Sequence, residues 1–246
     1  MSIKAERLTD SVTLYEGDCL EVLPTLAPGS VDAVVTDPPY GVELGKHNDQ
    51  RRDGSHLGKK GYRDFQDTYE QFCNEVVPRL NVAIGMARRA AVFSGPNIHE
   101  QKKPDAIGGI YCPCAVGRTP WGFKNFLPVL LYGIAPDLHR GHRHTVLKST
   151  HDSPKCEHPC AKPTEWMRWL VQLAARKGES ILDPFAGSGT TAIAAMKEGR
   201  KCILIEKDPH YCEIIRRRVR EADGTAPGTL FANVASVPDL FAGVQA

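Results

Sequence analysis

Two apolar runs in this chain each end in an aspartate that is followed by proline. Residues 31–36 lead into Asp37-Pro38-Pro39-Tyr40, and residues 180–182 lead into a glycine-rich segment at 183–190. Short, continuous apolar runs of this kind are typical of buried parallel strands. Open α/β sheets bind ligands beyond the carboxyl ends of their strands, so both motifs are expected to face one crevice.

Strand-like and helix-like segments alternate along most of the sequence. The clearest helix begins at Pro163 and carries Trp166, Trp169, Leu170 and Leu173 on one face, which we expect to pack in the core. Two strand-like pieces at 109–116 and 126–132 are close enough in sequence to pair antiparallel. This order predicts the α/β class, with a doubly wound, mostly parallel sheet and an antiparallel edge.

The length of 246 residues favours one domain, which we expect over 1–223. The segments 41–66 and 136–160 lose apolar periodicity and gain histidine and basic residues, which predicts two inserted basic loops. Residues 224–246 are rich in glycine, alanine and proline and are expected to form a flexible tail.

Composition narrows the class of protein. The formal net charge of +2 is too small to indicate nucleic-acid binding by itself. No run approaches the roughly 18 to 20 apolar residues that span a bilayer, so we expect a cytoplasmic protein with no membrane contact. The eight cysteines are expected to be reduced thiols. Cys112, Cys114, Cys156 and Cys160 are spaced poorly for zinc, so no metal is predicted.

The glycine-rich segment suits a ligand that the backbone approaches closely. Its glycines permit a sharp turn without Cβ clashes, and the following helix presents free N–H groups. The lysine of a phosphate-binding loop is missing, because Thr190 and Thr191 follow Gly189. Glu206 ends the next strand, where a carboxylate can accept hydrogen bonds from both hydroxyls of a ribose. The pair predicts an adenosine-containing cofactor, and the alternative is a plain strand-to-helix turn with an incidental surface glutamate.

The Asp-Pro-Pro-Tyr tetrapeptide suits an exocyclic amine. Its two prolines lack N–H groups and hold the carbonyls of Asp37 and Pro38 in an extended segment. The Asp37 carboxylate and the Pro38 carbonyl could accept both hydrogens of an amine and so expose its lone pair to an electrophilic methyl group. Tyr40 would stack on a base taken out of its duplex. A proline-rich strand exit with no ligand is the alternative.

Taken together, these motifs resemble the amino-group DNA methyltransferases that use S-adenosylmethionine. The catalytic motif precedes the cofactor motif, which is similar to the permuted β group of that family. Further matches are Gly17-Asp18-Cys19, Ser30-Val31-Asp32 and the His-Pro-x-x-Lys-Pro element at 158–163. The resemblance spans most of residues 12–221 and implies a Rossmann-like methyltransferase fold.

The resemblance implies a role for each matching position. Asp37, Pro38, Pro39 and Tyr40 would be catalytic and would hold the target base. Glu206 would hold the ribose, Asp18 would contact the adenine amine of the cofactor, and 158–163 would close over its methionine end. The full set implied at the cofactor is Asp18, Cys19, Asp37, Lys162, Asp183, Pro184, Phe185, Ala186, Gly187, Ser188, Gly189, Thr190, Glu206 and Lys207.

The implied reaction is methyl transfer from S-adenosylmethionine to adenine N6 in double-stranded DNA after base flipping, in a bacterial restriction-modification setting. An initial Asp in the tetrapeptide favours adenine, and N4-cytosine methylation is the alternative. From other classes, a catalytically inactive cofactor- and DNA-binding accessory protein, or methylation of RNA or a protein amide, stays open. The implied location is a bacterial cytoplasm, nucleoid-associated or phage-encoded.

Both basic loops are expected to contact DNA phosphates, with a solvated loop as the alternative. The residues expected to do so are Lys46, Arg51, Arg52, Lys59, Lys60, Arg140 and Arg143. Little chain remains for a separate recognition domain, so these loops or a partner would read the DNA sequence, or the sequence specificity would be low. A homodimer and a sliding clamp bound through 237–241 are weaker partner hypotheses. For 237–241, a flexible tail that binds no clamp is the favoured alternative.

Replacing Arg51 and Arg52 together with alanine should weaken DNA binding and flatten its dependence on salt, because two phosphate contacts would be lost. Titrations of a labelled duplex across a series of salt concentrations measure this. Binding that is unchanged over the whole series would contradict the assignment.

Overall fold

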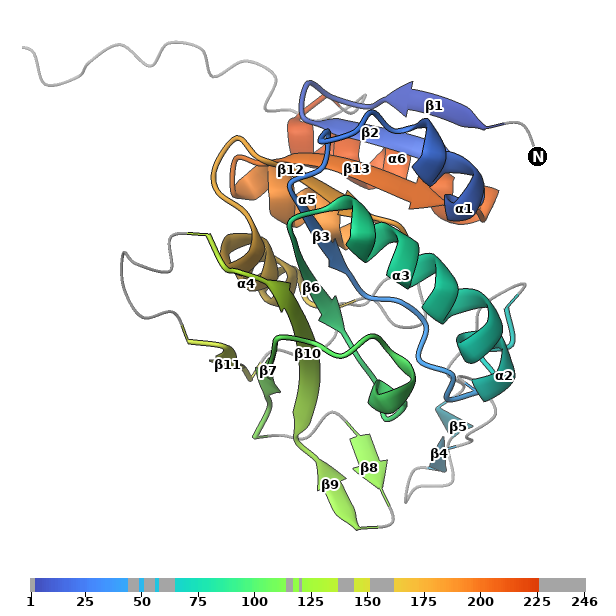
Figure 1. Ribbon diagram of the computed structural model, residues 1–246, viewed down its shortest axis with the longest axis vertical. Helices are drawn as coiled ribbons and strands as arrows, with labels where there is room; N and C mark the ends of the chain where they lie inside the picture. Colours follow the sequence, from blue (N-terminus) through green and yellow to red (C-terminus); the bar gives the residue numbers. More distant parts are fainter. Residues whose placement is uncertain are drawn as a thin grey trace, which may run out of the picture.

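The computed structural model describes residues 3–43, 49–50, 56–57, 65–113, 117–119, 121–136, 144–150 and 162–225. Its centre is a nine-stranded sheet of order β1-β2-β13-β12-β3-β6-β10-β7-β11 (Figure 1). The strands of this sheet are β1 (Lys4–Arg7), β2 (Val12–Glu16), β3 (Ala33–Thr36), β6 (Arg89–Phe93), β7 (Ala106–Tyr111), β10 (Phe126–Gly133), β11 (Val146–Lys148), β12 (Ser180–Asp183) and β13 (Lys201–Glu206).

Five adjacent strands, β2, β13, β12, β3 and β6, run parallel. The pairing sets Ile181 of β12 beside Ala33 of β3 on one side and Cys202 of β13 on the other. The carboxyl ends of β3 and β12 therefore lie side by side, as predicted from the two motifs that follow them. The mostly parallel α/β sheet is confirmed.

The predicted antiparallel pair exists as β10 and β7, and β10 is also antiparallel to β6. This pair is not the outer edge, because β11 pairs in parallel with β7 beyond it. The strand β11 lies inside the segment 136–160 that was predicted to be a loop throughout, so that prediction is wrong for 146–148. The opposite edge is β1, which is antiparallel to β2.

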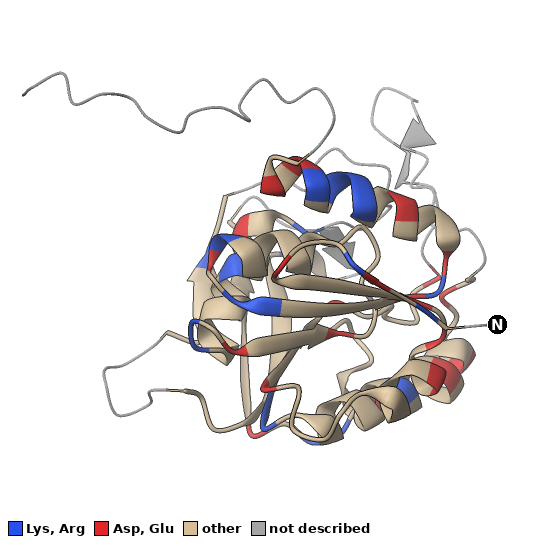
Figure 2. Cartoon of the chain, turned by 90° about the horizontal axis from the view of Figure 1, so that it is seen from above, with Lys and Arg blue, Asp and Glu red and all other residues tan. Residues whose placement is uncertain are grey.

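Helices cover both faces of the sheet, which Figure 2 shows edge-on between two helical layers. Apolar side chains of α4, α5 and α6 pack on one face, and those of α1 and α3 pack on the other. This arrangement confirms the doubly wound prediction. The helices are α1 (Cys19–Val22), α2 (Tyr69–Gln71), α3 (Val77–Met86), α4 (Thr164–Ala174), α5 (Thr190–Lys197) and α6 (Pro209–Asp223).

One helical segment, over residues 69–86, is interrupted. It begins as α2, passes through a π-helical turn at Phe72–Val76 and continues as α3 to Met86. Pro78 stands in the first turn of α3, where its missing N–H costs least. In α4, Trp166, Leu170 and Leu173 are buried and Trp169 is partly buried against the same core, which confirms the predicted packing face.

Two small hairpins lie outside the main sheet. They pair β4 (Asp49–Gln50) with β5 (His56–Leu57), and β8 (Gly117–Thr119) with β9 (Gly122–Lys124). Most of the predicted basic loops and the predicted tail beyond residue 225 lie outside the described residues. Within the part that is described, no helix has the length and apolar character that crossing a bilayer would need.

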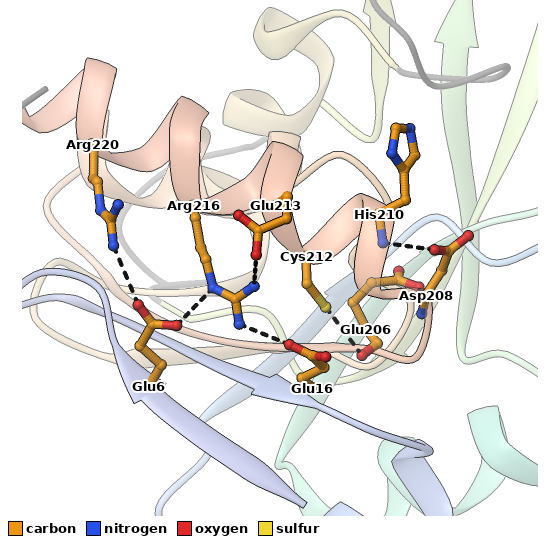
Figure 3. A network of polar contacts seen from close by, with 9 residues as sticks. All are labelled: Glu6, Glu16, Glu206, Asp208, His210, Cys212, Glu213, Arg216 and Arg220. Carbon is orange, nitrogen blue, oxygen red and sulfur yellow. Dashed lines mark hydrogen bonds and ion pairs between the residues drawn. The ribbon is translucent and has the colours of Figure 1, made fainter. Parts of the chain in front are cut away.

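A buried arginine fastens the edge strand β1 to the rest of the fold. The Arg216 guanidinium of α6 contacts Glu6 of β1 at 2.7 Å and Glu16 of β2 at 2.8 Å, and it also binds Glu213 on its own helix (Figure 3). Three carboxylates around one guanidinium raise the pKa of Arg216. A second ion pair, from Arg220 to Glu6, reinforces the same strand. The short and mostly exposed β1 therefore depends on charge pairing more than on apolar burial.

Replacing Arg216 with methionine should lower the free energy of unfolding by roughly 3 kcal/mol, because Glu6 and Glu16 would keep their charges with their common cation removed. Urea unfolding measures this loss, and faster amide hydrogen exchange should be concentrated in β1. The matched control is Arg217→Met, which removes an exposed arginine of the same helix. Equal stability of the two variants would contradict the role assigned to Arg216.

Candidate active site

A cavity of about 470 Å³ opens at the carboxyl ends of β2, β3, β12 and β13. Both sequence motifs contribute to its wall, so the predicted common crevice exists. The predicted positions that line it are Asp18, Cys19, Asp37, Pro39, Lys162, Asp183, Pro184, Phe185, Ala186, Gly187, Ser188, Thr190, Glu206 and Lys207.

Three predicted positions do not line the cavity. Pro38, the second residue of the tetrapeptide, is buried. Tyr40 contacts the cavity wall indirectly, through a hydrogen bond from its hydroxyl to Asp37. Gly189 precedes α5 with a left-handed φ of 76°, and a Cβ on it would lie 3.0 Å from the side chain of Ile215. This glycine therefore shapes the turn rather than the surface that a ligand would touch. The seven predicted DNA-binding residues lie outside the described residues.

Asp183 joins the two motifs. Its carboxylate accepts a hydrogen bond from the Thr36 hydroxyl of β3 at 2.6 Å, another from the Thr191 hydroxyl of α5, and a third from the backbone N–H of Phe185 at 3.1 Å. Burial raises the pKa of Asp183 to about 6 against the opposing effect of these hydrogen bonds. The side chain therefore has a structural function between β3 and the glycine-rich turn.

Glu206 holds the other side of the same turn. Its carboxylate accepts hydrogen bonds from the backbone N–H groups of Gly187 at 2.7 Å and Asp208 at 2.9 Å. Burial raises the pKa of Glu206 to about 7. Each carboxylate oxygen has a further lone pair, so the group can still accept a hydroxyl from a ligand in the cavity.

Asp18 is fixed by its own helix and by α3. It caps α1 by accepting the backbone N–H of Leu20 at 2.8 Å, and it receives two hydrogen bonds from Arg79, at 2.7 and 3.2 Å. The Arg79 and Leu20 contacts outweigh burial and hold the pKa of Asp18 below its usual value. A carboxylate paired with an arginine thus lines the cavity.

The tetrapeptide presents Asp37 between two donors. The Tyr40 hydroxyl donates to Oδ1, and the Lys162 ammonium donates to Oδ2 at 2.6 Å. Lys162 Nζ also lies 5.1 Å from the centre of the Tyr40 ring, within the range of a cation–π contact. Sequence reasoning assigned Lys162 to the cofactor set, and the structure joins it to the tetrapeptide as well.

The chain beyond the tetrapeptide is held by two polar side chains. Asn97 donates to the carbonyl of Tyr40 at 2.9 Å, and the buried Asp67 accepts the N–H of Gly41 at 2.7 Å. Tyr40 packs directly against Gly95, where an added Cβ would come within 2.6 Å of the Cβ of Tyr40. These contacts fix the orientation of Tyr40 and leave little room for a larger residue at 95.

Sequence reasoning missed several residues at this site. Arg79, Glu75 and Val76 line the cavity from the π-helical turn and α3, and Phe65 lines it ahead of them. The helical period of 68–80 could have placed 72, 75, 76 and 79 on one face, but nothing in the sequence linked that face to Asp18. Among the described residues no cluster of three metal-binding side chains occurs, and Cys112 is a buried cysteine outside any disulfide.

Comparison with known proteins identifies a matching family model and two relatives of this chain. The family model for DNA methylase of the N6 and N4 type matches residues 98–217. The type II methyltransferase M2.DpnII of Streptococcus pneumoniae is 24% identical over 247 residues, covering 88% of this chain and 92% of that protein. The type II methyltransferase M.BglI of Bacillus subtilis is 41% identical over 63 residues, covering 26% of this chain and 18% of that protein.

Solved structures share the fold. A DNA modification methylase of Thermus thermophilus, so described in its structure with S-adenosyl-L-methionine, matches with a TM-score of 0.58 and 23% identity over 85% of this chain and 93% of that one. The PvuII DNA methyltransferase, described as cytosine-N4-specific, matches with a TM-score of 0.61 and 14% identity over 91% of this chain and 95% of that one.

The raised pKa values of Asp183 and Glu206 predict a pH dependence of stability. Because the folded protein binds protons more tightly than the unfolded chain at both sites, the free energy of unfolding should fall as pH rises from about 4 to about 7. Each group can contribute at most about 1.4 kcal/mol per pH unit.

Urea unfolding between pH 4 and 7.5 tests this prediction, and Glu206→Gln should flatten the curve between pH 4.5 and 7. The matched control is Glu70→Gln, which changes an exposed carboxyl and should leave the curve unaltered. A wild-type stability that rises with pH across this window would contradict the assignment.

Proposed function

We propose that the chain is an S-adenosylmethionine-dependent DNA amino-methyltransferase of the N6 and N4 type and that it methylates the N6 amine of adenine in DNA. The observation that carries the proposal is the position of Asp37. Its carboxylate follows β3 and opens into the same cavity as Glu206 and the glycine-rich turn. A base amine and an adenosine cofactor could therefore meet in one site.

The residues of the cavity fit S-adenosylmethionine. Glu206 would accept the ribose hydroxyls, and the Asp18 carboxylate would accept the adenine amine of the cofactor. Phe185 and Ile205 offer apolar contact at the carboxyl ends of β12 and β13, and Lys162 and Lys207 offer cations for a carboxylate. When bound, the cofactor supplies a methyl group made electrophilic by the sulfonium.

Asp37 would then act on the target base. Its carboxylate would accept one N–H of the amine while the Pro38 carbonyl accepts the other, which would favour a tetrahedral nitrogen with a localised lone pair. The same carboxylate would stabilise the positive charge that the nitrogen gains during transfer. Tyr40, held against Gly95 and hydrogen-bonded to Asp37, would stack on the flipped base.

Adenine is the preferred base because the tetrapeptide begins with Asp. N4-cytosine methylation is the competing outcome, since the matching family includes both activities. The inactive accessory protein is disfavoured by the intact contact between Tyr40 and Asp37. We further propose that the basic residues of 41–66 and 136–160 contact the phosphates that flank the flipped base, and that the protein acts within a bacterial restriction-modification system.

Incubation with labelled S-adenosylmethionine and plasmid or genomic DNA, followed by nucleoside analysis, should yield N6-methyladenine. If N4-methylcytosine is the only product, the target base is cytosine and not adenine. If neither product forms on any DNA, the proposal is contradicted. Sequencing of the methylated DNA would then identify the target sequence.

Replacing Asp37 with asparagine should lower kcat by about a hundredfold or more, because the amide offers a weaker acceptor and no negative charge. The dissociation constant of the cofactor should change far less. Calorimetry and single-turnover methylation measure the two quantities. Asp10→Asn, at an exposed aspartate that does not line the cavity, is the matched control. A kcat of Asp37→Asn near that of the control would remove Asp37 from the chemistry.

A further inference from the structure

The Lys162 ammonium occupies the acceptor that the proposed reaction needs. It lies 2.6 Å from Asp37 Oδ2, and the other oxygen of the same carboxylate accepts the Tyr40 hydroxyl. Both side chains of the pair are largely shielded from solvent, with 11% of Lys162 and 20% of Asp37 exposed. A charge-assisted hydrogen bond of this kind is about twice as strong as one from a neutral amine. The base amine would therefore compete poorly for Asp37 while Lys162 stays in place.

The charge of Lys162 is a second obstacle. Methylation places positive charge on the amine nitrogen, and an ammonium beside it would oppose that change. Lys162 therefore has to leave Asp37 before methyl transfer. A second ammonium, that of Lys124, lies close enough for the charge of Lys162 to add to the effect of burial in lowering the pKa of Lys124.

The cavity offers Lys162 another anion once the cofactor binds. Lys162 lines the same cavity as Asp37 and Asp183, at its junction with the tetrapeptide. The methyl group to be transferred must lie near Asp37, and the carboxylate of the methionine end is joined to the same sulfur by a short alkyl chain. That carboxylate is therefore confined to the part of the cavity that Lys162 can reach from its position beside α4.

We propose that Lys162 exchanges the Asp37 carboxylate for the carboxylate of the cofactor, so that cofactor binding makes Asp37 available to the target amine. Lys162 is then a positioning residue that couples the cofactor site to the base site. This inference rests on the proposed function. It predicts that the cofactor carboxylate, and not its adenosine part, enhances binding of a flipped base.

The first test needs neither DNA nor activity. S-adenosylhomocysteine carries the methionine-end carboxylate, and 5′-methylthioadenosine lacks it. Calorimetry with Lys162→Met should show a loss of about tenfold in affinity for S-adenosylhomocysteine, as expected for one charged contact, and little change for 5′-methylthioadenosine. An equal change for both ligands would overturn the contact. The matched control is Lys103→Met, which removes an exposed lysine outside the cavity.

The second test measures the coupling. The DNA is a duplex that contains the target sequence found by sequencing. Its target base is mismatched so that the base flips easily. Binding of this duplex is titrated with and without each ligand. In the wild type, S-adenosylhomocysteine should tighten binding at least about tenfold more than 5′-methylthioadenosine does. In Lys162→Met, the two ligands should have equal effects, because Asp37 is already available. The same ligand difference in both proteins would overturn the proposal.

Two precautions keep these outcomes distinct. Lys162→Gln serves as a second variant if Lys162→Met unfolds, because its neutral amide can still donate a hydrogen bond to Asp37. A wild type that binds S-adenosylhomocysteine but methylates no DNA would contradict the proposed function, and the first test would still decide the contact of Lys162. Methylation with no difference between the ligands would leave the function intact and overturn the coupling.

Discussion

The buried carboxylate of Asp183 is the contact on which the site depends. It ends β12, accepts the hydroxyl of Thr36 at the end of β3, and accepts the hydroxyl of Thr191 in the first turn of α5. A buried carboxylate with too few donors is costly, so each of these partners is required for the turn to adopt this shape. The same contact sets the residue after Thr36, which is Asp37, beside the glycine-rich turn. The Asp-Pro-Pro-Tyr tetrapeptide and the glycine-rich turn, which are far apart in sequence, thereby share one wall of the cavity.

Charge is distributed across the cavity in a way that suits a ligand carrying both signs. Glu206 and Asp18 lie at the ends of β13 and β2, and both are already engaged, by backbone N–H groups and by Arg79 respectively. Lys162 lies beside the Asp-Pro-Pro-Tyr tetrapeptide and is paired with Asp37. Glu206, Asp18 and Lys162 are each held by a hydrogen-bonding or ion-pair partner within the protein. The side chains of the cavity are therefore ordered before a ligand binds. Such preorganisation reduces the cost of binding.

The periphery of the sheet uses a different kind of stabilisation from its centre. The parallel strands are buried on both faces by α1 and α3 on one side and α4 to α6 on the other. The edge strand β1 has few buried residues and is held through Glu6 by Arg216 and Arg220 (Figure 3). Polar anchoring at an edge also limits pairing with other chains, because charged side chains disfavour edge-to-edge contact.

Much of the fold could be predicted from the sequence because the patterns that specify its strands and helices are local. Apolar runs that end in Asp37 and Asp183, and the apolar face of α4 around Trp166 and Leu170, follow from the periods of strands and helices. The strands at the two edges of the sheet could not be predicted from the sequence. The strand β11 is three residues long and lies in a polar segment, and β1 is held by an arginine 210 residues away in sequence. Short strands of this kind form because a neighbouring strand is present, which local patterns do not record.

The sequence by itself determined the residue types of the site and their order along the chain: an acid-and-proline motif after one strand, a glycine-rich turn after another, and an acid after the next. Only the tertiary structure decided which groups are paired. The contacts of Arg79 with Asp18, of Thr36 with Asp183 and of Lys162 with Asp37 each join residues far apart in sequence. Hydrogen bonds and ion pairs act over a few ångströms in space, and a sequence specifies those separations only after the sheet has set its strand order.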